Sequence, residues 1–267
     1  MKLLVTGGRT GYLGRHVVAA AAPAGHEVVA VGSGDADVRD RAEVDALLER
    51  HRPDAVVHTA YVQADREVTA TGAAHVARAA AAHGARTVLV SSDVVFGGSD
   101  RPYPETAPTD PVSAYGEAKV EAETAALDAL ASGADVVVAR TSLILGDGRS
   151  GHEQLVHALA AGADGGLFED ERRCPVHVGD LARALVELAG NDVRGVLHVA
   201  GADAMSRHEM GVLVARRDGL DPDMLRPVSR AALAIPGPVD VRLDSTLAAT
   251  VLTTRLRGAR EFLRDQR

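Results

Sequence analysis

The sequence predicts an α/β protein, in which a doubly wound parallel sheet carries helices on both faces and a small lobe follows at the C-terminal end. Three observations support this fold class. Apolar strand-like runs alternate with helical segments over residues 1–145, a glycine-rich turn follows the first run, and the alternation loosens beyond residue 146. With 267 residues, 46% of them hydrophobic, the chain is long enough to bury the core of such a fold.

Five strands and the helices between them account for the first part of the chain. Each strand is a short run rich in valine, leucine and alanine, as expected for parallel strands that are buried on both faces. Gly, Pro or Asp residues separate the runs from the helices. In chain order, the predicted elements are strand 2–8, a helix to residue 22, strand 26–32, helix 41–51, strand 55–60, helix 66–83, strand 86–92, a loop over 97–113, a helix that carries Tyr115 and Lys119, and strand 134–142.

The second part of the chain is less regular. Glycine-rich stretches at 146–151 and 162–166 precede a helix at 180–189, a strand at 195–201 and two more helical segments. We therefore assign residues 1–145, with later returning segments, to the core and residues 146–267 mainly to the lobe. Because residues 146–176 combine glycine-rich stretches with a short apolar helix pattern, we expect them to cover a bound molecule and to be more mobile than the core.

Composition excludes several classes of protein. The formal net charge of −8, with both signs mixed along the chain, argues against a nucleic-acid partner. The N-terminal apolar run is too short for a signal peptide and no apolar stretch approaches 18 residues, so we expect a cytoplasmic protein with no membrane contact. The single cysteine, Cys174, excludes an internal disulfide and is expected to be a small buried side chain. We expect no metal site, since ligand spacing is absent from the histidines at 58, 152, 157 and 177.

The glycine-rich turn "VTGGRTGYLGRHV" is the first functional motif. Gly8, Gly11 and Gly14 follow a strand and open a helix, which is the context in which such glycines let backbone amides and a helix N-terminus approach a pyrophosphate. The turn therefore predicts a dinucleotide ligand and a Rossmann-type sheet.

The end of the second strand favours NADP(H) over NAD(H). An NAD-specific fold usually offers Asp or Glu there to the ribose hydroxyls, whereas this chain has Gly32 and Ser33. Arg9 and the hydroxyl of Ser33 could instead receive a 2′-phosphate. NAD(H) stays an alternative if the loop folds back and brings the carboxylate of Asp35 to the ribose. Asp37 is expected to meet the adenine, with capping of the next helix as its structural alternative.

Tyr115 and Lys119 form the second motif. They are four residues apart on a predicted helix, so both side chains project from one face, and Lys119 is one of only two lysines in the chain. A nearby ammonium lowers the pKa of a tyrosine, which makes the phenol a better proton donor and acceptor near neutral pH. A hydroxyl that positions a carbonyl group should complete the set. Ser92, at the end of a strand, is the candidate, with Ser91 as its competitor.

Taken together, "GRTGYLG", "SSDVVFGG" and "YGEAK" resemble the extended short-chain dehydrogenases/reductases. More narrowly, "RPDAVVHTA", "DVRD", "ETAPTDPVSAYGEAKVEAE", "RTSLILG" and "CPVHVGDLARAL" resemble the dTDP-4-dehydrorhamnose reductase group, or sugar-nucleotide-binding proteins, over most of the chain. The resemblance implies a catalytic set of Ser92, Tyr115 and Lys119. It also implies cofactor contacts at Gly11, Tyr12, Leu13, Asp37, Val38, Ala60 and Tyr61, and substrate contacts at Ser92, Asp93 and Leu143.

Four features depart from that resemblance. The glycine turn has one residue more than usual, because Gly7 precedes Gly8. Thr69 stands where many extended members have an asparagine. Val94 stands where sugar-nucleotide dehydratases carry a glutamate, which disfavours dehydration. With three Phe and no Trp, the chain offers little for stacking on a nucleobase.

These motifs lead to one expected function and two alternatives. The expected function is NAD(P)H-dependent reduction of a keto group on a small molecule, such as the nucleotide-linked sugar dTDP-4-keto-6-deoxyhexose. The alternatives are a sugar-nucleotide epimerase that retains NAD and a non-catalytic dinucleotide-binding subunit. A homodimer is left open.

Overall fold

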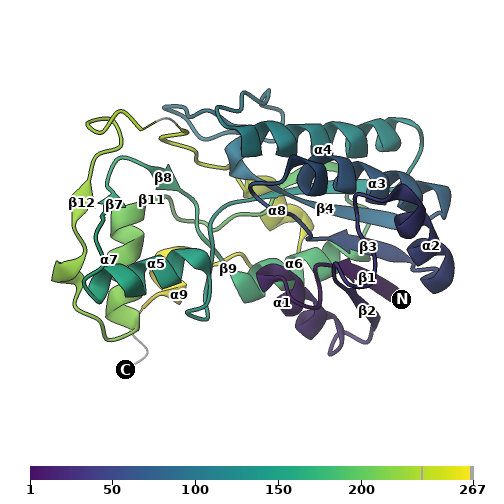
Figure 1. Cartoon of the computed structure of the whole chain (residues 1–267), viewed down its shortest axis with the longest axis horizontal. Helices are drawn as coiled ribbons and strands as arrows, with labels where there is room; N and C mark the ends of the chain where they lie inside the picture. The colour runs from purple at the N-terminus through teal and green to yellow at the C-terminus, as the bar shows by residue number, and fades with distance from the viewer. Residues whose placement is uncertain (236, 265–267) are drawn as a thin grey trace.

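A six-stranded parallel sheet forms the centre of the molecule, in the order β10-β5-β4-β3-β1-β2. The computed structural model describes residues 1–235 and 237–264 (Figure 1). The strands are β1 (Lys2–Thr6), β2 (Glu27–Val31), β3 (Ala55–His58), β4 (Arg86–Ser92), β5 (Val136–Thr141) and β10 (Gly195–His198). The strand order reverses between β1 and β3. Ligands of open α/β sheets bind outside the carboxyl ends of the strands at such a point.

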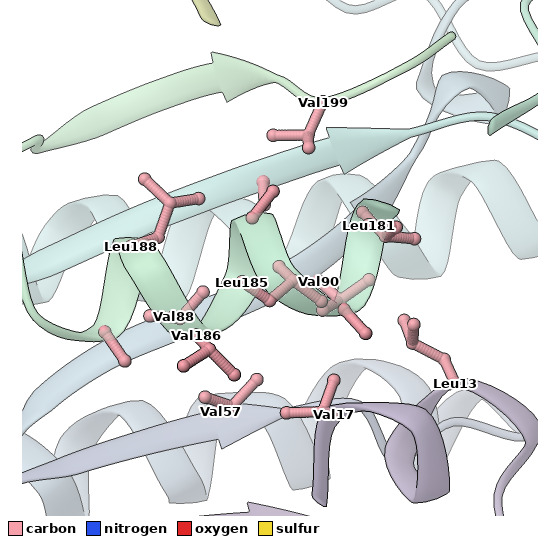
Figure 2. Close-up of a cluster of buried hydrophobic side chains, with 14 of the residues drawn as sticks. Leu13, Val17, Val57, Val88, Val90, Leu181, Leu185, Val186, Leu188 and Val199 are labelled. Atoms are coloured by element: carbon pink, nitrogen blue, oxygen red, sulfur yellow. The ribbon is translucent and has the colours of Figure 1, made fainter. Parts of the chain in front are cut away.

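Helices cover both faces of this sheet, as the sequence predicts. Alternate residues along each strand point to opposite faces, so that Leu3 and Val5 pack with α1 (Tyr12–Ala21) and α6 (Val178–Ala189). Leu4 packs on the other face, which is covered by α2 (Arg41–His51), α3 (Gly72–Ala82) and α4 (Ala114–Ala131). Figure 2 shows α6 lying along the strands, with Leu185 and its neighbours directed at the sheet and at α1.

A second apolar cluster lies beside the sheet, on the left of Figure 1. It is built by α5 (Gly151–Ala160), α7 (Arg207–Arg217) and α9 (Ala259–Phe262), with Val156, Met205 and Met210 buried between them. Six two-residue strands hold the connecting segments: β6 (Ile144–Leu145) with β9 (Val176–His177), β7 (Leu167–Phe168) with β12 (Pro227–Val228), and β8 (Arg172–Arg173) with β11 (Met205–Ser206). The helix α8 (Thr246–Val251) returns to the sheet beside β10.

Most predicted elements agree with the structure, with three differences. The helix expected at 66–83 begins as one turn of π-helix, η1 (Glu67–Thr71), before α3. Asp40, not Asp37, caps α2, because its carboxylate accepts hydrogen bonds from the amides of Ala42 and Glu43. The two-residue strands are too short to have a sequence pattern. Cys174 is buried, as predicted, and burial raises the pKa of its thiol to about 11.

In the described part of the chain, every helix is too short or too polar to span a bilayer.

Candidate active site

A cavity of about 560 Å³ runs along the carboxyl ends of the strands. Its walls come from the glycine turn, from the loops after β2 and β3, from the end of β4, from α4 and from the start of α5. The cavity brings together most of the residues that the sequence singles out: Gly11, Tyr12, Leu13, Gly14, Ser33, Asp37, Val38, Ala60, Tyr61, Ser92, Asp93, Tyr115, Lys119 and Leu143. Gly8 and Arg9 are not part of its lining.

The glycine turn is organised around Gly7. Its φ of +70° is in the left-handed region that favours glycine, and its carbonyl accepts a 2.9 Å hydrogen bond from the amide of Gly11. A Cβ on Gly14 would lie 2.3 Å from that carbonyl oxygen, so the helix can approach the turn only without a side chain there. Gly8 turns away from the cavity and lies against the carbonyl of Val5. Gly7 therefore lines the cavity where the sequence predicts Gly8, because the additional residue shifts the turn by one position.

The loop after β2 folds back on itself. The carboxylate of Asp35 accepts a 2.8 Å hydrogen bond from the amide of Gly32 and forms a 2.9 Å ion pair with Nε of Arg9. The side chain of Arg9 is 62% exposed and its charge is paired with Asp35. Arg9 therefore lies beside the cavity and does not line it. A different cation, Arg39, does line the cavity and pairs with Asp37, and its hydrogen bonds hold the pKa of Asp37 down at about 2.

Helix α4 places Tyr115 against the end of β4. Ser113 caps the helix by accepting a 3.1 Å hydrogen bond from the amide of Gly116. A Cβ on Gly116 would lie 2.4 Å from the carbonyl oxygen of Val94, so the first turn of α4 packs directly on the segment after β4. This close approach brings the phenol of Tyr115 to the hydroxyl of Ser92.

Lys119 lies one turn further along α4 and is 6% exposed. Its Nζ donates a 3.0 Å hydrogen bond to the carbonyl of Val90 and lies 5.1 Å from the ring centroid of Tyr61 and 5.9 Å from that of Tyr115. Burial lowers the pKa of Lys119 to about 8, while the charge of Glu123 acts in the opposite direction.

The pKa of Tyr115 differs from the sequence-based expectation. Burial is the largest cause and raises the pKa, the proximity of Tyr61 and Asp93 raises it further, and the hydrogen bond with Ser92 lowers it. The expected lowering by Lys119 is absent: burial of the ring dominates the pKa, and the ammonium of Lys119 is hydrogen-bonded to the carbonyl of Val90. Tyr115 consequently keeps its proton near neutral pH.

Ser91 and Ser92 have different surroundings. Ser92 is half-buried beside Tyr115, and its Oγ accepts a 3.4 Å hydrogen bond from the amide of Val94. Ser91 is 2% exposed, and its Oγ has no hydrogen-bond partner among the described residues. The geometry thus favours Ser92 as the hydroxyl that acts with Tyr115.

Asp93 belongs to a group of buried charged side chains at the end of the cavity away from the glycine turn. Its Oδ2 accepts a 2.6 Å hydrogen bond from Ser142 and lies 3.5 Å from Nε of Arg173. Burial raises the pKa of Asp93, and Arg173 acts against that rise. Asp93 is therefore held by protein groups, while Leu143 lines the cavity beside it.

Sequence reasoning missed two basic side chains and a histidine in this region. Arg173 and Arg207 line the cavity and both pair with Glu171, and Arg207 donates a 2.8 Å hydrogen bond to Nδ1 of His152. Burial lowers the pKa of His152 to about 4, so its ring is neutral near pH 7. Residues 152, 173 and 207 come from separate segments, and no spacing in the sequence links them.

Two further contacts fix the walls of the cavity. The hydroxyl of Tyr12 donates a 2.8 Å hydrogen bond to Asp147, whose other oxygen lies 3.2 Å from Nε2 of His16, so the glycine turn is tied to the segment after β6. The hydroxyl of Thr69 donates to the carbonyl of Val62 at 2.8 Å and accepts from its amide at 3.2 Å. Thr69 thereby holds the loop that carries Tyr61.

Comparison with known proteins gives a consistent result. The family model described as the RmlD substrate binding domain matches residues 1–266. The dTDP-4-dehydrorhamnose reductase of Mycobacterium tuberculosis (strain H37Rv) is 36% identical over 253 residues, which cover 88% of this chain and 82% of that protein. The enzyme of the same name from Mycolicibacterium smegmatis is 34% identical over 281 residues, covering 98% and 84%.

Among solved structures, the dTDP-4-dehydrorhamnose reductase of Bacillus anthracis in complex with NADP superposes with a TM-score of 0.86 at 22% identity. The match covers 98% of this chain and 96% of that one. At this identity the likeness establishes the Rossmann-type fold.

Proposed function

The chain belongs to the RmlD substrate binding domain family, and from that premise we propose that it is an NADPH-dependent reductase of the short-chain dehydrogenase/reductase type. The proposed reaction converts the keto group of a nucleotide-linked 4-keto-6-deoxy sugar into an alcohol. The names of the relatives support this substrate class. The observation that carries the proposal is the single cavity that has the glycine turn on one wall and Ser92, Tyr115 and Lys119 on another.

The residues present fit a dinucleotide. Gly7, Gly11 and Gly14 allow a tight turn, since a Cβ at Gly11 or Gly14 would clash with the carbonyl oxygen of Gly7, and α1 begins there with its free amides. The exposed residues Ser33, Arg39 and Tyr61 line the space that extends from this turn along the strand ends. When bound, NADPH supplies the hydride for the keto carbon.

Tyr115 supplies the proton that the reduction consumes. Its phenol is protonated near neutral pH and lies beside the hydroxyl of Ser92, which can donate a hydrogen bond to the carbonyl oxygen of the substrate. The charge that develops on that oxygen is then stabilised by Ser92 and neutralised by the phenolic proton. Lys119, with its ammonium beneath Tyr61 and Tyr115, stabilises the phenolate that remains.

The choice of NADPH over NADH rests on the groups around the end of β2. Asp35, the acid nearest to that strand end, is bonded to Arg9 and to the backbone and is not part of the cavity lining. Ser33 and Arg39 line this part of the cavity and offer a hydroxyl and a positive charge to a 2′-phosphate. NADH stays the alternative cofactor.

The test is an assay of NADPH oxidation with dTDP-4-keto-6-deoxyhexoses, with the same sugars lacking the nucleotide as controls. The proposal expects turnover with the nucleotide-linked sugars, and Tyr115→Phe provides the inactive control. Isomerisation of the sugar without net NADPH oxidation, in a protein that purifies with bound NAD, would identify an epimerase instead. Binding of NADPH with no turnover of any keto sugar would indicate a non-catalytic subunit.

A further inference from the structure

A buried ion pair lies one helical turn beyond Lys119 on α4. Glu123 is four residues further along α4, so it projects from the same face of the helix as Lys119, and it is 3% exposed. Arg140 on β5 is 4% exposed, and two of its nitrogens donate hydrogen bonds to this carboxylate, Nε at 3.0 Å and Nη2 at 2.7 Å. Such a bidentate pair fixes the orientation of the carboxylate.

Arg140 is itself fixed in this position. Its guanidinium carbon lies 5.1 Å from the ring centroid of Phe96, and its Cα is in register with Ser91 on β4. The third nitrogen, Nη1, is buried and has no hydrogen-bond partner among the residues that the structure describes. The polar contacts given for the guanidinium therefore all go to Glu123, as expected of a group that holds that carboxylate.

The other titratable groups near Lys119 are neutral or have their charge paired elsewhere. Burial lowers the pKa of His58 to about 3, so its ring is neutral, and burial raises the pKa of Tyr115. The acid on the segment after β4, Asp93, is paired with Arg173, and its pKa is raised by burial. The titratable groups on the elements packed against Lys119 are Tyr115, Glu117, Glu121, Glu123 and Asp128 on α4, His58 on β3, Tyr61 after it, Arg86 on β4, Asp93 after it, Arg140 on β5, and Glu67, His75 and Arg78 on η1 and α3.

We propose that Glu123, held by Arg140, is a positioning residue that keeps the ammonium of Lys119 charged against the cost of its burial. The inference rests on the proposed function only for the role that it gives Lys119. The electrostatics agree in direction, since the charge of Glu123 opposes the effect of burial on the pKa of Lys119. Without Glu123, desolvation would act unopposed and Lys119 would lose its proton at a lower pH.

The two lysines of the chain make a direct measurement practical. In protein labelled with ¹³C-lysine, NMR should resolve one signal from Lys119 and one from Lys2, which is near the surface and serves as an internal reference. We expect Glu123→Gln to lower the titration midpoint of Lys119 by about one pH unit or more, the usual effect of removing a nearby opposite charge. The midpoint of Lys2 should not change. In the assay, the basic limb of the kcat/KM profile should move down by the same amount.

Controls separate this role from a purely structural one. Glu121→Gln removes an exposed carboxylate on α4 that pairs with Arg66 from another segment. This variant should leave the titration midpoint of Lys119 unchanged. Glu123→Asp should restore part of the shift. Because Glu123→Gln leaves Arg140 without its anion and could prevent folding, the double variant Glu123→Gln/Arg140→Gln provides a neutral buried pair. An unchanged Lys119 midpoint in whichever of these two variants folds overturns the proposal, and this readout does not depend on enzymatic activity.

Discussion

Tyr115 and Lys119 illustrate how burial competes with local charge. The sequence correctly predicts that the two side chains share one helix face, because a four-residue spacing on a helix is a local property. The direction of the tyrosine pKa was predicted wrongly, since burial depends on packing against Val94 and Tyr61 from other segments. The result is a protonated phenol beside a buried ammonium.

The first prediction concerns the proton donor. Tyr115→Phe removes the phenolic proton and preserves the ring that packs against Tyr61, so the fold and the affinity for NADPH should be retained. We expect kcat to fall by about 10²- to 10⁴-fold, the usual contribution of a positioned general acid. Steady-state kinetics with a parallel fluorescence titration of NADPH provide the measurement. Turnover close to the wild-type rate would remove Tyr115 from the mechanism.

A second prediction concerns His58, which is buried beneath the site with its Nδ1 hydrogen-bonded to Thr6 at 2.8 Å. Its pKa falls from 6.5 to about 3 on folding, first through desolvation and then through the charge of Lys119. The unfolded chain therefore binds the proton more tightly, and stability is full above pH 6.5 and is lost as the pH falls towards 3. The free energy of unfolding should decline by up to about 1.4 kcal/mol per pH unit from this group.

His58→Asn tests this contribution, because the amide oxygen can take the place of Nδ1 beside Thr6. Between about pH 4 and pH 7, His58 is protonated to different extents in the folded and unfolded states. Urea unfolding in this range should therefore show that the free energy of unfolding depends less on pH in the variant. His83 is exposed, so the variant His83→Asn serves as the control. It should show the same change of unfolding free energy with pH as the wild type. Equal slopes in all three proteins would contradict the assignment.

Among the elements, the loop after β2 shows where sequence reasoning ends. Gly32 and Ser33 were recognised as a neutral strand end, but the return of Asp35 onto Gly32 and Arg9 depends on the path of the loop. Short strands such as β7 and β12 were missed for the same reason. Their two-residue pairings arise between segments that are distant in the sequence, whereas α2 and β4 have their own periodicity and were predicted with the observed bounds.

The third prediction tests the cofactor preference at this loop. NADPH should bind more tightly than NADH, and Arg9→Ala should weaken NADPH binding alone if the arginine leaves Asp35 for the 2′-phosphate. A charge-assisted bond of about 1.5–3 kcal/mol corresponds to roughly a tenfold to hundredfold effect. Asp35→Asn should act in the opposite direction, by releasing Arg9. Titration of both cofactors decides the point: a selective loss in Arg39→Ala but not in Arg9→Ala would leave Arg39 as the arginine that contacts the 2′-phosphate, and no selective loss in either variant would contradict the preference for NADPH.

The segment after β6 gives the fourth prediction. Tyr12 ties Asp147 to the glycine turn, so Tyr12→Phe should free residues 146–152 and increase their backbone hydrogen exchange. The sequence predicts that residues 146–176 are more mobile than the core, and the same experiment on the wild type measures this. Tyr103→Phe, which alters a hydroxyl bonded to Gly98, is the control. If residues 146–152 exchange at the same rate in Tyr12→Phe and in the wild type, the hydrogen bond between Tyr12 and Asp147 does not hold this segment.

Across the whole molecule, the chain passes repeatedly between the sheet and the second apolar cluster. It leaves the sheet after β5, returns as α6 and β10, leaves again for α7 and returns as α8 beside β10. The sequence predicts these returning segments, because the apolar pattern of α6 is strong, but it does not predict which cluster each short segment joins. A unit built from interleaved segments cannot separate without breaking contacts in both clusters (Figure 1).

The last prediction follows from this interleaving: both clusters should unfold in one cooperative transition. Leu185→Ala in the sheet cluster and Met210→Ala in the second cluster each remove a side chain that is at most 1% exposed, at a cost of about 2–5 kcal/mol. Each should therefore lower the midpoint of the same single urea transition, whether it is followed by circular dichroism or by hydrogen exchange at the two clusters. Leu247→Ala, at a side chain that is 45% exposed, should change stability by less than about 0.5 kcal/mol. Two separate transitions, each shifted by only one of the buried variants, would show instead that the second cluster folds independently and that the cavity walls are held together mainly by contacts such as Tyr12 with Asp147.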